Sequence, residues 1–154
     1  MLVRAPSGRQ RFNVLGALQA ITHQLITVTN DSYINATSVC ELLEKIASLG
    51  LCTPITVVMD NARYQRCRLV VEKATALGIE LLFLPTYSPN LNLIERLWKF
   101  VRKECLYSTY YEHFDAFKHA ITQCLVETTG RHQAALSRLL TLEFQTFESA
   151  GRDR

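Results

Sequence analysis

Two stretches of the sequence decide its fold: residues 55–62 read ITVVMDNA, and residues 84–98 read LPTYSPNLNLIERLW. The first is a continuous apolar run, typical of a β-strand buried on both faces, and it ends in Asp60. The second begins as a loop fixed by two prolines and continues into an amphipathic helix that opens near Glu95. These carboxylates, with 34 residues between them, could converge on a hard cation such as Mg²⁺, which prefers oxygen ligands. Carboxylate-bound metal pairs are one way to cut phosphodiesters.

Each acid also has a purely structural interpretation. Asp60 could cap the helix that follows it, although functional groups in open α/β sheets gather beyond the carboxyl ends of strands. The run from Asn92 to Glu95 resembles a capping box, and Glu95 could pair with Lys99 one turn later. Helix geometry alone therefore leaves both interpretations of each acid open.

The surrounding sequence indicates one α/β domain. Apolar patterning predicts a hairpin of residues 11–18 and 25–29, and strands at residues 55–59 and 79–84. Helices are predicted from Asn35 to a stop near Gly50, from Cys67 to a stop at Gly78, and after Asn92. Two further helices are predicted at residues 114–125 and 133–147. Strands that alternate with helices in this way favour a mixed sheet flanked by helices.

Composition narrows the class of protein further. The chain has 154 residues, of which 48% are hydrophobic and 20% charged, as expected for one globular domain. No run approaches the roughly 20 apolar residues of a membrane helix, and the first residues lack a signal peptide, so we expect a cytoplasmic protein that does not enter a membrane. The five cysteines and four histidines do not have zinc-site spacing, which favours buried or half-buried free thiols.

Basic residues follow both candidate metal ligands, Asp60 and Glu95, although the net charge of the chain is only +3. Three arginines follow Asp60 and four basic residues follow Glu95: Arg63, Arg66, Arg68, Arg96, Lys99, Arg102 and Lys103. This distribution suits a polyanion lying across an acidic site, but it is also what ordinary solvated helix faces look like. Aromatic residues leave a similar choice, because Trp98, Tyr107, Tyr110 and Tyr111 could stack on nucleobases or belong to a core or interface.

A family resemblance favours the functional interpretation. Two segments resemble those that carry the second and third catalytic acids in insertion-sequence transposases of the mariner-like superfamily. They are the tripeptide Asp60-Asn61-Ala62 and the string P-x-Y-S-P-x-L-N-x-I-E-x-x-W at residues 85–98. The catalytic part of those enzymes is the DDE endonuclease domain, and the resemblance covers about residues 5–147. The string at residues 85–98 is far more specific for this family than any pair of isolated acids.

The resemblance implies a ribonuclease-H-like fold and a two-metal site that contains Mg²⁺ or Mn²⁺. In that scheme Asp60 and Glu95 are metal ligands, and water and then a DNA 3′-hydroxyl attack a phosphodiester in line. Asn61 is implied to be a neighbouring site residue. Candidate contacts to DNA, suggested by charge rather than by a motif, are Arg63, Arg66, Arg96, Lys99 and Lys103.

The sequence departs from this family at its beginning. The family places its first catalytic Asp on a central strand before the hairpin, whereas the first acid here is Asp31, in a turn after the hairpin, and we do not assign it that role. We therefore expect residues 1–154 to be the C-terminal part of a DDE catalytic domain that lacks the first, central strand. An upstream segment would then supply the missing Asp and a helix-turn-helix region.

Two functional hypotheses follow. In the first, the chain is the catalytic fragment of a transposase, inactive until the upstream segment joins it, and capable of forming a homo-oligomer. In the second, it is a non-catalytic remnant that binds DNA or the intact transposase and at most inhibits it. The presence of an upstream reading frame that encodes a strand ending in Asp would favour the first hypothesis.

Overall fold

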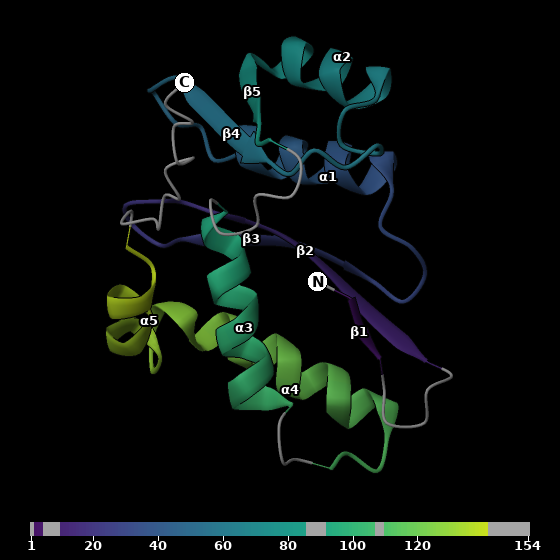
Figure 1. The fold of residues 1–154 in the computed structure, drawn as a ribbon, viewed down its shortest axis with the longest axis vertical. Coiled ribbons are helices and arrows are strands. Elements are labelled where there is room, and N and C mark those ends of the chain that lie inside the picture. Colours follow the sequence, from purple (N-terminus) through teal and green to yellow (C-terminus); the bar gives the residue numbers. More distant parts are fainter. Residues whose placement is uncertain (1, 5–9, 86–91, 107–109, 142–154) are drawn as a thin grey trace, which may run out of the picture.

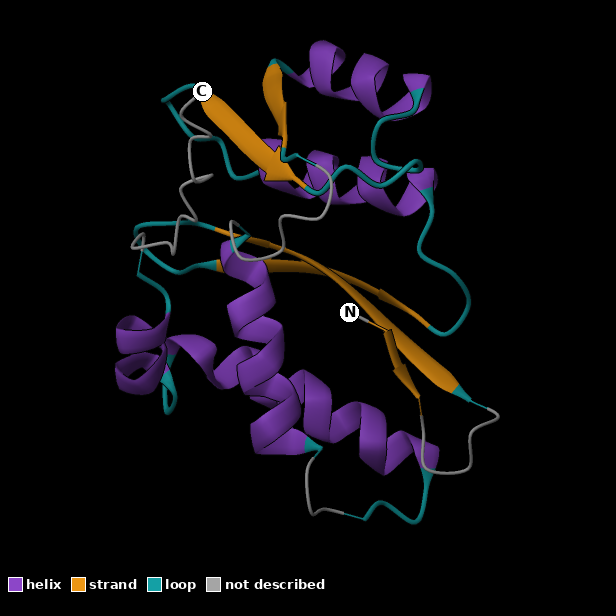
Figure 2. Cartoon of the chain, viewed as in Figure 1, coloured by secondary structure: helices purple, strands orange, loops and turns teal. Residues whose placement is uncertain are grey.

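The computed structural model describes residues 2–4, 10–85, 92–106 and 110–141, with only the backbone described for the first three of these. Its strands form two separate hydrogen-bonded sheets (Figures 1 and 2). In the first sheet, β1 (Leu2–Arg4), β2 (Arg11–Leu18) and β3 (Leu25–Asn30) run antiparallel in that order. In the second, β4 (Ile55–Met59) and β5 (Ile79–Phe83) run parallel.

The helices cover the antiparallel sheet on both faces. One face packs on α3 (Leu93–Cys105), with α4 (Phe114–Val126), the 3-10 helix η2 (Glu127–Thr129) and α5 (Gln133–Leu139) beside it. The other face packs on α1 (Ala36–Ala47), beyond which lie β4, β5 and the crossover helix α2 (Arg68–Leu77). Figure 1 shows this layering, with the two long strands β2 and β3 in the middle.

Alternation along β2 explains why the molecule has two cores. Phe12 and Val14 face α3 and α4, whereas Leu15 and Ala17 face α1. Successive strand residues point to opposite faces, so a single strand supplies both cores. The first core contains Leu97, Val101, Phe117, Ile121 and Leu136, and the second contains Val28, Val39, Leu43, Met59, Val70 and Ile79.

Local signals place the start of α1 and the end of α2 where the sequence predicts them. Asn35 caps α1, because its side chain accepts a hydrogen bond from the Ser38 N–H at 3.2 Å. Gly78 ends α2 in the left-handed conformation, with φ of 69°, which glycine adopts without steric cost. The last helix is shorter than predicted, since α5 ends at Leu139 and Leu140 leaves helical geometry; residues 142–147 of that prediction lie outside the described residues.

The strands form two sheets rather than the one mixed sheet that the sequence predicts. On the β1 side of β2, strand pairing stops at Asn13, so residues 14–18 pair only with β3 within the described chain. Similarly, β4 pairs only with β5 there. The α/β class is as predicted, and the division into two sheets is what the lack of a joining central strand would produce. The three-residue strand β1 was not predicted, because so short a run carries no readable alternation.

Candidate active site

Asp60 lies immediately after β4, at the carboxyl end of the parallel sheet. The Met59 carbonyl before it accepts a hydrogen bond from the Leu84 N–H at 2.8 Å, which aligns the exits of β4 and β5. A turn at residues 62–66 follows, and α2 begins only at Arg68, with Cys67 as its N-cap. The interpretation of Asp60 as a helix cap is therefore wrong, and its half-buried carboxylate is available for another role.

Asn92 connects the second decisive stretch to Asp60. It is the N-cap of α3, and its side-chain oxygen accepts a hydrogen bond from the Ile94 N–H at 3.2 Å. Its Nδ2 donates to Asp60 Oδ1 at 2.9 Å, and the residue is only 9% exposed. The start of α3 and the end of β4 thus meet, whereas the sequence predicts only a capping role for Asn92. The signal was its amide, which can accept and donate at once.

Glu95 occupies the first turn of α3 and is half-buried. Its backbone N–H donates to the Asn92 carbonyl at 3.2 Å, which places it one turn from the residue that contacts Asp60. Among the described residues its carboxylate has no ion pair, neither with Lys99 nor with another cation, and no reciprocal capping-box bond. A carboxylate at a helix N-terminus is stabilised by the helix dipole and here has spare capacity for a ligand.

The turn after Asp60 adds a phenol and two amides to this region. Burial and, to a smaller extent, the negative charge of Asp60 raise the pKa of Tyr64. Gln65 is buried, and its Oε1 has no hydrogen-bond partner among the described residues. Asn61 is half-buried directly after Asp60. The region therefore offers carboxylate and amide oxygens, the donor types that hard divalent cations prefer.

The candidate DNA contacts divide into two groups. Arg63, Arg66, Lys99 and Lys103 are exposed, and the described part of the chain provides no ion pair for any of them. Arg96 differs, because its Nη1 donates to the carbonyls of Leu139 at 3.3 Å and Thr141 at 2.8 Å. These hydrogen bonds connect α3 to the end of α5. Arg96 therefore has a structural role, which the charge pattern of the sequence did not indicate.

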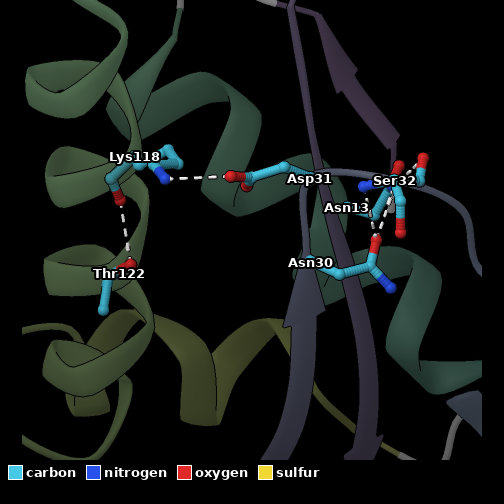
Figure 3. Close-up of polar contacts among 6 residues, drawn as sticks. All are labelled: Asn13, Asn30, Asp31, Ser32, Lys118 and Thr122. Carbon is cyan, nitrogen blue, oxygen red and sulfur yellow. Dashed lines mark hydrogen bonds and ion pairs between the residues drawn. The ribbon is translucent and has the colours of Figure 1, made fainter.

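Asp31 directly follows β3 and is held by a residue of α4 (Figure 3). Its Oδ2 accepts from Lys118 Nζ of α4 at 3.1 Å. Beside it, Asn13 Nδ2 donates to Asn30 Oδ1 at 2.8 Å and to the Ser32 carbonyl at 2.9 Å, which fixes the turn. The arrangement supports leaving Asp31 out of the predicted acids.

The Asp31–Lys118 pair is expected to contribute little stability. A double-mutant cycle with Asp31→Asn and Lys118→Met should give a coupling energy of about 0.2–1 kcal/mol, because both side chains are partly exposed. Chemical denaturation of the four proteins measures it. A coupling of several kcal/mol would show that Asp31 is a buried anchor of the fold rather than a surface contact.

The remaining candidates belong to the fold. Trp98 is 4% exposed and packs in the first core, so it is a core residue rather than a stacking platform. The Tyr111 hydroxyl donates to the Cys105 carbonyl at 2.6 Å, whereas Tyr110 is 78% exposed; Tyr107 lies outside the described residues. The cysteines are free, and three of them are buried and Cys67 is half-buried, as predicted. Cys52 is exposed, which the sequence did not predict.

Within the described residues, no group of three or more His, Cys, Asp or Glu side chains could hold a metal ion. Asp60 and Glu95 lie on elements that meet through Asn92, and residues 86–91 of the motif between them lie outside the described residues. The same part of the chain contains no helix of sufficient length and apolarity to span a membrane.

Comparisons with solved structures show the same fold in DNA-processing proteins. The chain is similar to a chain of the simian T-cell lymphotropic virus intasome in complex with PP2A regulatory subunit B56 gamma, with a TM-score of 0.62 and 15% identity over 84% of this chain and 46% of that chain. It thus spans about half the length of that relative. It is also similar to the catalytic domain of Mos1 mariner transposase, with a TM-score of 0.57 and 12% identity over 94% of this chain and 81% of that one.

A second structure of the Mos1 transposase catalytic domain, with raltegravir and Mg, gives a TM-score of 0.56 and 14% identity over 96% of this chain and 82% of that one. No curated protein sequence matches the chain. The sequence model of the DDE superfamily endonucleases, which act on DNA with divalent metal ions, matches residues 2–118, three quarters of the chain but less than the predicted reach to residue 147. The chain therefore belongs to the DDE superfamily of endonucleases.

Proposed function

We propose that residues 1–154 are the C-terminal part of a DNA transposase catalytic domain, in which Asp60 and Glu95 bind Mg²⁺ or Mn²⁺ for DNA strand cleavage and transfer. The hydrogen bond from Asn92 to Asp60 carries this proposal, because it joins the end of β4 to the start of the helix that bears Glu95. Membership of the DDE superfamily and the Mos1 fold likeness support it.

The residues present fit a divalent cation in part. Among the described residues, Asp60 has one oxygen bonded to Asn92 and Glu95 has no cationic partner, so in that part of the chain each has a carboxylate oxygen without a bond. Asp60 and Glu95 would hold a Mg²⁺ or Mn²⁺ ion, which would help to activate the attacking oxygen and to stabilise the leaving oxygen of an in-line displacement. The protein's own contribution is to hold these carboxylates at fixed positions and to neutralise DNA phosphates nearby.

A third carboxylate is needed to complete the site. Asp31 is engaged by Lys118, and the described residues offer no other acid beside Asp60 and Glu95. We place the missing acid on a segment outside residues 1–154 that pairs with the open edges of β2 and β4. Such a segment would also supply partners for buried backbone groups, each of which costs about 1–3 kcal/mol when left unpaired. A helix-turn-helix region upstream and assembly of several copies on DNA complete the proposal.

The test is reconstitution. Residues 1–154 alone should not nick DNA, because two carboxylates leave the metal poorly held and positioning is most of phosphoryl-transfer catalysis. A fusion or trans complex with an upstream segment that carries a strand ending in Asp should nick supercoiled plasmid in the presence of Mg²⁺. Nicking by residues 1–154 alone would contradict the need for a third acid from outside.

The alternative is a remnant that binds DNA or intact transposase without cutting. The lack of a third acid beside Asp60 and Glu95 in the described chain favours it. If the reconstituted protein stays inert while residues 1–154 suppress transposition by an intact relative, the remnant function is the correct one.

DNA binding should follow the exposed basic residues. Replacing Lys99 or Arg63 with alanine should weaken binding to any DNA sequence and reduce the slope of log K against log salt by about 1, because each phosphate contact releases about one counterion. Fluorescence anisotropy across a salt series measures the slope. Lys73→Ala is the control, since Lys73 is already paired with Glu44. Equal slopes for Lys99→Ala, Arg63→Ala and the parent would place the DNA surface elsewhere.

A further inference from the structure

Asn92 contacts both proposed metal ligands, although nothing in the motif marks it as more than a cap. Its Nδ2 donates to Asp60 Oδ1 at 2.9 Å, and its backbone carbonyl accepts from the Glu95 N–H at 3.2 Å. Its side-chain oxygen is used as well, by the Ile94 N–H at 3.2 Å. One residue therefore fixes the positions of a strand end and a helix start that are 32 residues apart.

Helix capping alone does not require asparagine at this position. Serine and aspartate cap helices about as well as asparagine does. However, ionised aspartate has no donor and would place a second negative charge against Asp60, and the serine hydroxyl ends one bond closer to the backbone. Only the amide satisfies the α3 N-terminus with its oxygen and the Asp60 carboxylate with its nitrogen.

Burial strengthens the hydrogen bond between Asn92 and Asp60. Asn92 is 9% exposed and Asp60 is half-buried, so water competes weakly for either group. A hydrogen bond to a charged acceptor is stronger than one between neutral groups. With Oδ1 engaged by Asn92, the rotation of the carboxylate is restricted, and Oδ2 is the oxygen to which no described residue donates.

We infer that Asn92 is a positioning residue, which orients the Asp60 carboxylate for metal binding and couples it to Glu95 through the first turn of α3. This inference rests on the proposed function of Asp60 and Glu95. Groups that orient metal ligands in this way typically change metal affinity or activity by about 10–100-fold when they are replaced.

The experiment compares two asparagine caps in the same chain. Asn92→Ser removes the donor to Asp60 and keeps a capping hydroxyl, whereas Asn35→Ser makes the same exchange at the N-cap of α1. Mn²⁺ is titrated into residues 1–154 and its binding followed by electron paramagnetic resonance of the free ion, with thermal unfolding measured in parallel. We expect Asn92→Ser to raise the Mn²⁺ dissociation constant by about tenfold or more, and Asn35→Ser to leave it unchanged.

The outcomes distinguish a failure of the positioning role of Asn92 from a failure of the proposed metal site. If Asp60→Asn weakens Mn²⁺ binding but Asn92→Ser does not, the positioning role is wrong and the proposed metal site stands. If Asp60→Asn has no effect, the metal site and the positioning role both fail. Should Asn92→Ser unfold the chain, Asn92→Thr, which also caps, replaces it, and an unchanged dissociation constant in that variant overturns the inference.

Discussion

Replacing Asp60 with asparagine or Glu95 with glutamine in the reconstituted protein is expected to reduce Mg²⁺-dependent nicking by about 10³-fold or more. Each exchange keeps the size of the side chain and removes one charged metal ligand. The loss of several kcal/mol of transition-state stabilisation corresponds to that factor, since about 1.4 kcal/mol is tenfold in rate. Single-turnover nicking of supercoiled plasmid measures the effect directly.

Two other acids serve as matched controls for these exchanges. Asp31→Asn removes a carboxylate that is paired with Lys118 at 3.1 Å, and Glu104→Gln removes an exposed one from the same helix as Glu95. Both control variants should nick within a few-fold of the parent. If Asp31→Asn is as damaging as Asp60→Asn, then Asp31 contributes the acid that we place outside residues 1–154.

The largest effect on stability is expected at Trp98. This side chain fills the first core and lies against Gly16 of β2, where an added Cβ would be 2.7 Å from Trp98 Cη2 and 2.9 Å from Cζ2. Trp98→Ala should cost about 3–5 kcal/mol of unfolding free energy, because the cavity cannot close completely. That is a large fraction of the roughly 5–15 kcal/mol that stabilises a typical domain. Urea denaturation measures the loss.

Gly16→Ala approaches the same contact from the other side. It should destabilise the protein by about 1–3 kcal/mol through overpacking, although alanine is otherwise better than glycine within a strand. Trp98→Phe removes the ring atoms that clash, so the double variant should lose less stability than the sum of the single losses. Strict additivity of Gly16→Ala and Trp98→Phe would contradict the contact.

Local sequence signals predicted the elements well because their causes are local. The apolar run 55–59 became β4, Asn35 caps α1, and Gly78 ends α2 with a positive φ. These features depend on residues a few positions apart, whose spacing the sequence shows directly. For Trp98 the sequence left a core role and a stacking role open, and its 4% exposure decides for the core.

Features that depend on distant partners were missed. The sequence gives no sign that Arg96 donates to carbonyls at Leu139 and Thr141, 43 and 45 residues away. The bond from Asn92 to Asp60 is equally non-local, and capping was a sufficient local explanation for the asparagine. The division of the strands into two sheets likewise depends on which backbone edges meet, which side-chain alternation does not determine.

A crystal structure of residues 1–154 soaked with Mn²⁺ would test the central claim most directly. Anomalous scattering should place a cation that contacts carboxylate oxygens of both Asp60 and Glu95 at distances of about 2.0–2.6 Å, the range for hard divalent ions. The Asn92 amide should remain bonded to the other Asp60 oxygen. A cation bound elsewhere, or carboxylates on opposite sides of the sheet, would contradict the shared metal site.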